Sequence, residues 1–206
     1  MKLLLLITAA IFTSLMMNFN GPRLKGQRAA PDTFDTVIRP FADKSYKLKL
    51  HIISEDSTRN RDKNNSVINF THSINGKTSV VFQDSIYCMT PWIYSKDFDG
   101  DGVKDILIFH IDGARANARF YLYLVKPLLK KLVYVKGFEE LPNADFDRKN
   151  KVITSMGLFG QSQWFKFYRI NGKYRLVNLG HSFISKTDEE DNKYETAMKS
   201  IRRKKY

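Results

Sequence analysis

Hydrophobic and polar residues alternate along short stretches of this chain, which is the pattern of half-buried β-strands. In residues 46–52, apolar side chains stand at every second position, with Lys47, Lys49 and His51 between them. Further β-type runs predict strands at residues 67–74, 77–83, 105–111, 120–125, 132–135, 152–155, 164–170 and 174–179. The chain therefore predicts a mainly β fold of antiparallel strands and hairpins.

Turn signals join several of these runs into hairpins. Asn75-Gly76 separates the second and third predicted strands, and Asn-Gly is the strongest short signal of a β-hairpin. The segment NGK at 171–173 separates the last two strands in the same way. We predict one antiparallel β domain over residues 34–201, and a propeller-like arrangement is one form that fits it.

Two segments depart from the strand pattern. Residues 138–141 precede Pro142 and predict a single helical turn. Residues 181–186 and 193–201 flank the turn sequence DEEDN, and we favour a further hairpin there over a terminal helix. The last residues, 202–206, are predicted to form a basic tail.

The start of the chain has the composition of a secretory signal. Lys2 is followed by a mainly apolar run over residues 3–17, which is shorter than the ~20 apolar residues of a membrane span. We predict a signal peptide over 1–20, a linker rich in Gly, Pro and charge over 21–33, and a periplasmic or secreted mature chain without a transmembrane helix. No A-x-A motif precedes residue 21, so an uncleaved anchor is the alternative.

The composition agrees with one folded domain. Of the 206 residues, 43% are hydrophobic, which is enough for an ordinary core. Cys88 is the only cysteine, so no internal disulfide forms, and its apolar neighbours predict that it packs as a small hydrophobe. The net charge is +13, and five of the cations stand in the last eight residues, KSIRRKKY. Such a segment contacts an anionic surface or stays solvated, and nothing predicts specific nucleic-acid binding.

The segment DFDGDGVKD at 97–105 is the most informative in the chain. It carries carboxylates at its first, third, fifth and ninth positions and a glycine at the sixth, where a sharp turn is needed. Ca²⁺ takes about six to eight oxygen ligands, and a tight loop directs alternate side chains and a backbone carbonyl at one centre. We predict one bound Ca²⁺, held by the side chains of Asp97, Asp99, Asp101 and Asp105 and by the carbonyl of Val103.

This loop is not an EF-hand, because its twelfth position is Ile108 in place of Glu and an apolar strand follows. Two other interpretations stay open. The segment is a solvated acidic turn without an ion, or it is the Asp-x-Asp pair that haloacid-dehalogenase-type phosphatases carry after an apolar strand, here at 92–94. In those phosphatases Thr and a helix follow and Mg²⁺ binds, whereas Asp101 and a strand follow in this chain.

The loop resembles the Ca²⁺ loops of FG-GAP and VCBS-type repeat proteins, which have the form D-x-D-G-D-G-x-x-D. A longer resemblance covers residues 96–177 and includes FYLYLV at 120–125, FEELPNADFD at 138–147 and the hairpin FYRINGKYRLV at 167–177. This part is similar to a family of exported calcium-binding proteins of Gram-negative bacteria, which includes immunity proteins and inhibitors of lysozyme-like peptidoglycan hydrolases. The resemblance implies that the four aspartates bind Ca²⁺ and that the partner is a protein.

In the related inhibitors, an exposed loop enters the cleft of the hydrolase. The matching segment here is GLFGQSQW at 157–164, in which two apolar residues stand between glycines and suit a pocket of a partner. It departs from the inhibitor pattern, since it has no Ser-Gly followed by Tyr. An ordinary hairpin turn with a buried Phe159 is the alternative. The resemblance implies partner contacts by four residues: Leu158, Phe159, Gln161 and Ser162.

These observations favour a binding protein over an enzyme. The four histidines lie far apart in the sequence, and Glu139 and Glu140 are neighbours whose side chains point apart, so no catalytic group is indicated. We expect an exported calcium-binding protein that inhibits a cell-wall hydrolase in the manner of an immunity protein. The alternative is a calcium-stabilised surface or cell-wall attachment domain, in which the basic tail contacts an anionic polymer.

Overall fold

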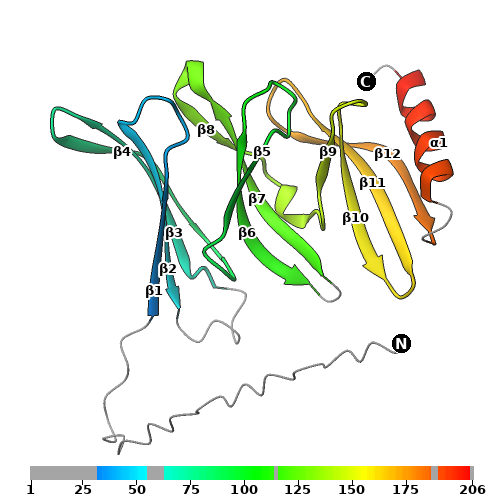
Figure 1. Cartoon of the computed structure of the whole chain (residues 1–206), viewed down its shortest axis with the longest axis horizontal. Coiled ribbons are helices and arrows are strands. Elements are labelled where there is room, and N and C mark those ends of the chain that lie inside the picture. Colours follow the sequence, from blue (N-terminus) through cyan, green and yellow to red (C-terminus); the bar gives the residue numbers. More distant parts are fainter. Residues whose placement is uncertain (1–31, 55–62, 114–115, 187–189, 205–206) are drawn as a thin grey trace, which may run out of the picture. The chain divides into compact units, whose positions relative to one another are not determined.

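The computed structural model describes residues 32–54, 63–113, 116–186 and 190–204, all within one compact unit (Figure 1). The predicted signal peptide, 1–20, and nearly all of the predicted linker, 21–33, lie outside the described residues. Within the described residues, no helix has the length and apolar character needed to cross a membrane.

The described strands form three four-stranded antiparallel sheets, and each strand pairs with its neighbours in the sequence. Sheet A consists of β1 (Asp32–Ile38), β2 (Tyr46–Ser54), β3 (Ser66–Ile74) and β4 (Lys77–Ile86). Sheet B consists of β5 (Ile93–Lys96), β6 (Asp105–Gly113), β7 (Asn117–Lys126) and β8 (Lys131–Tyr134). Sheet C consists of β9 (Asp145–Asp147), β10 (Val152–Phe159), β11 (Ser162–Ile170) and β12 (Leu176–Ser185).

Three short or terminal helices complete the described elements, namely η1 (Pro127–Leu129), η2 (Phe138–Glu140) and α1 (Glu190–Arg203). The predicted mainly β, antiparallel fold is confirmed, and the described strands form no closed barrel. The propeller-like form stays a prediction.

The predicted turns lie between the strands that they were expected to join. Asn75 and Gly76 connect β3 to β4 with φ values of 50° and 79°, which Asn and Gly adopt more readily than other residues. The second turn joins β11 to β12, and the Asn171 side chain accepts the N–H groups of Lys173 at 2.9 Å and Arg175 at 3.0 Å. Both hairpins therefore follow from local turn chemistry.

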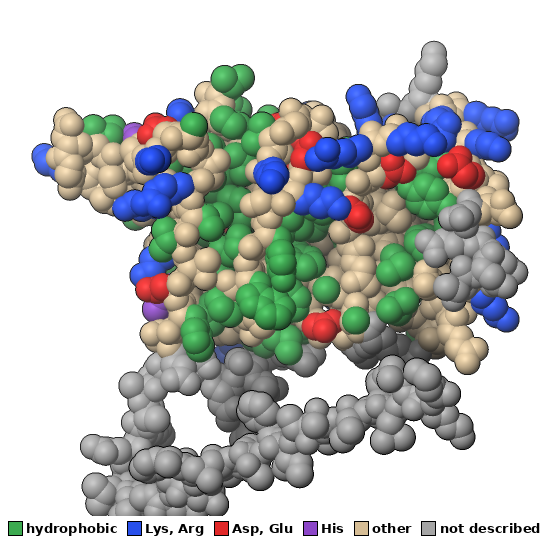
Figure 2. Space-filling view, viewed as in Figure 1, with side chains coloured by type: hydrophobic (Ala, Val, Ile, Leu, Met, Phe, Trp, Pro, Cys, Tyr) green, Lys and Arg blue, Asp and Glu red, His purple; other side chains and the backbone are tan. Residues whose placement is uncertain are grey.

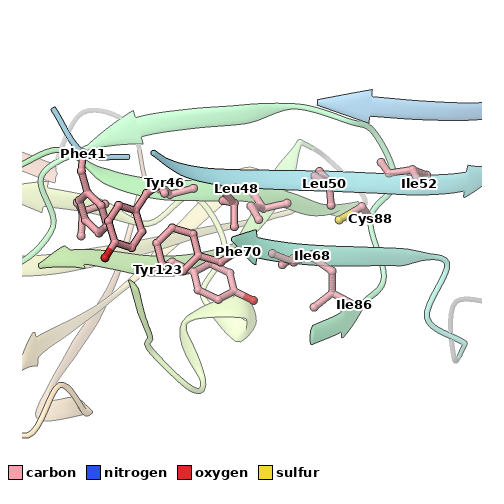
Figure 3. Close-up of a cluster of buried hydrophobic side chains, with 13 residues drawn as sticks. Phe41, Tyr46, Leu48, Leu50, Ile52, Ile68, Phe70, Ile86, Cys88 and Tyr123 are labelled. Atoms are coloured by element: carbon pink, nitrogen blue, oxygen red, sulfur yellow. The ribbon is translucent and has the colours of Figure 1, made fainter. Parts of the chain in front are cut away.

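Sheet B lies between sheets A and C, and both of its faces are buried. Ile106 and Ile108 of β6 pack with side chains of sheet A, whereas Leu107 between them packs with side chains of sheet C. Figure 3 shows the cluster between sheets A and B, in which Tyr123 of β7 lies among side chains of β2 and β3. Burial on both faces explains why residues 106–109 form a continuous apolar run instead of an alternating one.

The C-terminal hairpin that we predicted is wrong. Residues 181–185 extend β12, and residues 193–201 lie within α1, which packs on sheet C (Figure 1). Met198 and Ile201 are buried in one cluster with Phe167, as their spacing on one helix face allows. Burying this apolar face against the sheet stabilises the helix, whereas a hairpin would place the same residues on alternating faces.

The first two residues of the predicted basic tail, 202–206, belong to α1. Arg202 and Arg203 form the last turn of α1, where cations interact favourably with the helix dipole. The N–H of Lys204 still donates to the Ser200 carbonyl at 3.3 Å. Arg202 and Arg203 are therefore carried by a packed helix.

Strand β1 was not predicted, and its first two residues fall within the predicted linker. It is an edge strand that pairs with β2 alone, and Phe34 and Val37 are about half exposed. Because no face of this strand is well buried, the segment lacks the period-two pattern that indicates the other strands.

Candidate metal centre

The acidic loop connects β5 to β6 at one end of sheet B. Lys96 pairs with Asp105 at the last rung of the β5–β6 ladder, so the loop closes on itself. Phe98 points from the loop into the core between sheets B and C, where its ring packs edge-on against Phe138 with centroids 5.1 Å apart. Gly102 has a φ of 86°, which permits the turn. The loop is therefore an anchored part of the fold.

Asp105 is the most deeply buried carboxylate of the loop. Its two oxygens accept the N–H of Phe98 at 2.8 Å and the N–H of Val125 at 3.0 Å. Burial raises the pKa of Asp105 to about 7, and the negative charge of Asp99 acts in the same direction. Asp105 thus links the loop to β7, in surroundings where a cation would favour its ionised form.

Asp97, Asp99 and Asp105 bring their carboxylates together. Asp97 accepts the N–H groups of Gly100 at 2.7 Å and Gly102 at 3.1 Å, which fixes its orientation. One oxygen from each of the three carboxylates lies within 4.8 Å of the others. Ca²⁺ binds oxygens at about 2.3–2.6 Å, so two ligands of one ion lie up to about 5 Å apart. The donor set fits one hard cation such as Ca²⁺.

The fourth predicted carboxylate, Asp101, lies against a lysine and outside this cluster. The Lys126 ammonium donates hydrogen bonds to Asp101 Oδ2 at 2.8 Å and to Asp99 Oδ2. Burial lowers the pKa of Lys126, but its hydrogen bonds to the two carboxylates outweigh burial and raise that pKa overall. Val103 donates its N–H to Asp101 Oδ1 at 2.8 Å, and a metal-ligand role for its carbonyl stays a prediction.

Lys126 is a residue of this site that sequence reasoning missed. It ends β7, 25 residues after Asp101, and stands outside the loop motif. The pairing register of β6 and β7 could have revealed that Lys126 lies near the loop. Ile106 pairs with Tyr123, so continuing the ladder past the strand end brings Lys126 beside Val103.

The predicted partner segment forms the tip of the β10–β11 hairpin. Phe159 pairs with Ser162 across the two turn residues, Gly160 and Gln161, so the segment is an ordinary hairpin turn. Phe159 is 80% exposed, so the alternative of a buried Phe159 is wrong. Gln161 is exposed as well, whereas Leu158 and Ser162 are half-buried. Contact of these four residues with a partner stays a prediction.

Two sets of contacts brace this hairpin. The N–H of Leu158 donates to Asn117 Oδ1 at 2.9 Å, and Asn117 Nδ2 donates to the Leu158 carbonyl at 3.2 Å. Gly157 lies against the Trp164 ring, and a Cβ at this position would come within 2.1 Å of that ring. Phe159 therefore projects from a closely packed support.

Other chemistry-bearing side chains lie apart from the loop. Glu139 accepts the N–H of Gly137 at 2.9 Å, whereas Glu140 lies 3.6 Å from Arg119, so the two carboxylates point apart as predicted. Cys88 is buried, and burial raises the pKa of its thiol to about 12. Its environment agrees with the predicted packing role.

No protein-family model matches this chain, and no curated protein matches it either. The resemblance to exported calcium-binding proteins therefore stays a prediction. The assignment of the acidic loop depends on its own geometry, which brings three of the four predicted carboxylates together.

Proposed function

We propose that this chain is an exported protein that binds one Ca²⁺ in the loop 97–105 and inhibits a cell-wall hydrolase by direct binding. The convergence of the Asp97, Asp99 and Asp105 carboxylates is the observation that carries the calcium part. The exposed Phe159 at a braced hairpin tip supports the binding part, because buried aromatic anchors dominate many protein interfaces. The apolar run after Lys2 supports export to the periplasm or the exterior.

Asp105 would couple ion binding to the stability of the fold. It accepts one N–H from the loop, at Phe98, and one from β7, at Val125, so a cation at this carboxylate would hold the loop against sheet B. A cation would also relieve the mutual repulsion of three close carboxylates. We therefore assign the ion a structural role and derive no chemical step from it.

Thermal unfolding in a Ca²⁺ titration tests this site, with Asp99→Asn as the site variant. Asp112→Asn is the matched control, because Asp112 is an exposed carboxylate at the other end of β6. Extracellular Ca²⁺ modules bind at around 10⁻⁴–10⁻³ M, so about 10 mM Ca²⁺ should stabilise the native state by about 1.4–2.7 kcal/mol. We expect this gain in the unsubstituted protein and in Asp112→Asn, and a much smaller gain in Asp99→Asn.

An unfolding midpoint that does not respond to Ca²⁺ in any of the three proteins would overturn the calcium part. An equal response in Asp99→Asn and Asp112→Asn would place the ion outside the loop. A response to Mg²⁺ alone would favour the phosphatase interpretation of the Asp-x-Asp pair.

The inhibitory part is tested by binding and activity assays against a panel of lysozyme-like peptidoglycan hydrolases. Phe159→Ala should weaken binding by about thirtyfold or more, since an aromatic hot spot contributes about 2 kcal/mol or more. Ile184→Ala is the matched control, because Ile184 is a large apolar side chain that is 67% exposed on β12. If no hydrolase binds, or if both variants lose affinity equally, the inhibitory part fails while the calcium part still stands.

A calcium-stabilised attachment domain is the second candidate, and the distribution of charge favours it. Lys and Arg side chains gather along the edge where the C-terminal end of α1 lies (Figure 2). If the basic end of the chain contacts an anionic cell-wall polymer, removing residues 204–206 should lower attachment to isolated cell walls. The same truncation should leave hydrolase inhibition unchanged, which separates the two candidates.

A further inference from the structure

A pocket of about 520 Å³ opens between the β9–β10 turn, the end of β11 and the last turn of α1. Four cationic side chains line it, those of Lys149, Lys151, Arg169 and Arg202. Asp99 is the one carboxylate among the described lining residues, and it accepts a hydrogen bond from Lys126. The pocket therefore has a strong excess of positive charge.

The elements that carry these cations are fixed to one another. Asp147 accepts the N–H of Asn150 at 3.0 Å, the amide of the same residue at 2.6 Å and the Tyr194 hydroxyl at 2.6 Å, which joins the β9–β10 turn to α1. Arg169 Nε donates to the Lys151 carbonyl at 3.2 Å, which joins β11 to the same turn. These bonds involve neither the Lys149 ammonium nor the Lys151 ammonium. Both ammonium groups therefore extend from a backbone that hydrogen bonds hold in place.

At Lys149, Lys151 and Arg202, the positive charge is at most weakly compensated within the described part of the chain. No carboxylate there forms an ion pair with Lys149 or Lys151. Arg202 lies 3.7 Å from Glu195, but both side chains are about half exposed, and such surface pairs contribute little. Like charges lining one concavity focus a positive potential that favours an anion with more than one negative charge.

The remaining lining residues indicate what such an anion is attached to. Phe146 and Ile170, which are both half-buried, supply apolar surface beside the cations, and Asn150 adds a polar group. Guanidinium groups match phosphate oxygens in geometry, and pockets of about 300–1,000 Å³ suit small organic ligands. We infer that this pocket binds a phosphate ester, with the phosphate among the four cations and the organic part against the apolar side chains. The site requires neither Ca²⁺ nor a hydrolase partner.

Calorimetric titration of the full chain with phenyl phosphate and with inorganic phosphate tests the inference, in a buffer that contains a calcium chelator. The site variant is Lys149→Gln with Arg202→Gln, both exposed lining positions. The matched control is Lys173→Gln with Arg203→Gln, which removes the same two charges from exposed residues that do not line the pocket. Thermal unfolding without ligand verifies that both variants are folded.

We expect saturable binding of one phenyl phosphate per chain, and tighter binding of phenyl phosphate than of inorganic phosphate. Affinity should fall about tenfold or more in the site variant, because two charge-assisted contacts are lost, and by less than about twofold in the control. Equal losses in the two variants would mean that diffuse charge attracts the anion, and would overturn the inference. Absence of saturable binding to either phosphate would also overturn it.

Sedimentation with phosphatidylcholine vesicles, with and without phosphatidic acid, distinguishes two sources of the phosphate. Sedimentation that requires phosphatidic acid and that is lost in the Lys149→Gln, Arg202→Gln variant would support a lipid headgroup as the ester. Binding of phenyl phosphate without sedimentation would support a soluble phosphate ester.

Discussion

The acidic loop 97–105 and the tip of the β10–β11 hairpin lie at opposite edges of the described sheets (Figure 1). In the loop, the carboxylates are held largely by nearby backbone N–H groups, as Asp97 is by the N–H of Gly100. At the hairpin tip, the supporting side chain comes from far along the chain, since Asn117 is 41 residues from Leu158. One region is held mainly by local turns and the other by tertiary packing.

This difference indicates how each region should respond to substitution. A buried carboxylate with backbone donors cannot be replaced without leaving N–H groups badly paired, so the loop should respond mainly through stability and cation affinity. The hairpin tip exposes its aromatic residue, so a change there should act on partner binding, while a change at its support should act on stability. The following predictions test this contrast from the largest expected effect to the smallest.

Asp105→Asn should destabilise the protein by about 3 kcal/mol, measured by urea unfolding in the presence of a calcium chelator. An amide oxygen can accept only one of the two N–H groups that Asp105 now accepts, from Phe98 and Val125, and the amide nitrogen would face the other. Asp112→Asn is the control, since it removes an exposed carboxylate from the same strand. If both variants unfold at the same urea concentration, the loop is not anchored through Asp105.

Gly157→Ala should cost about 1–3 kcal/mol in the same assay, because the new Cβ would overlap the Trp164 ring. Gly172→Ala adds the same methyl group at a position with no atom within 4 Å of the added Cβ, and it should change stability by less than about 0.5 kcal/mol. Near-equal stability of the two variants would show that the Trp164 ring moves aside freely, and that the hairpin is not braced by this contact.

Much of the fold could be predicted from the sequence, because most strands either alternate in polarity or are bounded by Asn-Gly turns. The prediction failed at the C-terminal segment, where the apolar residues fit both the period of a strand and the period of a helix. Residues 181–185 extend a strand, but Tyr194, Met198 and Ile201 follow the helical spacing that places them on one face against sheet C. Only the presence of that sheet makes the helical period the more stable choice.

The candidate site could also be predicted only in part. The spacing of the carboxylates within the loop predicted three residues that converge, but it also placed Asp101 among them. No feature of the motif indicates that Lys126 lies close enough to pair with Asp101 and Asp99, because that contact depends on how β7 pairs with β6. Residues distant in sequence thus decide which carboxylates face one another.

Lys126→Met gives the smallest effect and the sharpest test of the loop. The ammonium competes with a metal ion for Asp99, so removing it should raise Ca²⁺ affinity by about fivefold, since such an ion pair contributes about 1 kcal/mol. Lys104→Met, which removes an exposed cation from the loop itself, is the control and should change affinity by less than about twofold, because screened surface charges act weakly. Calorimetric Ca²⁺ titration measures both.

The opposite outcome of this experiment is equally informative. Suppose that Lys126→Met lowers the free energy of unfolding by about 1 kcal/mol or more, and that neither this variant nor the unsubstituted protein binds Ca²⁺. The Lys126 ammonium is then itself the cation that neutralises the loop. The motif would then keep the backbone turns of a metal loop, with Asp97 and Asp105 held by N–H groups, while a lysine from β7 replaces the ion. Such a result would mean that the loop keeps its conformation without a metal ion, because the backbone N–H groups hold these carboxylates whichever cation lies beside them.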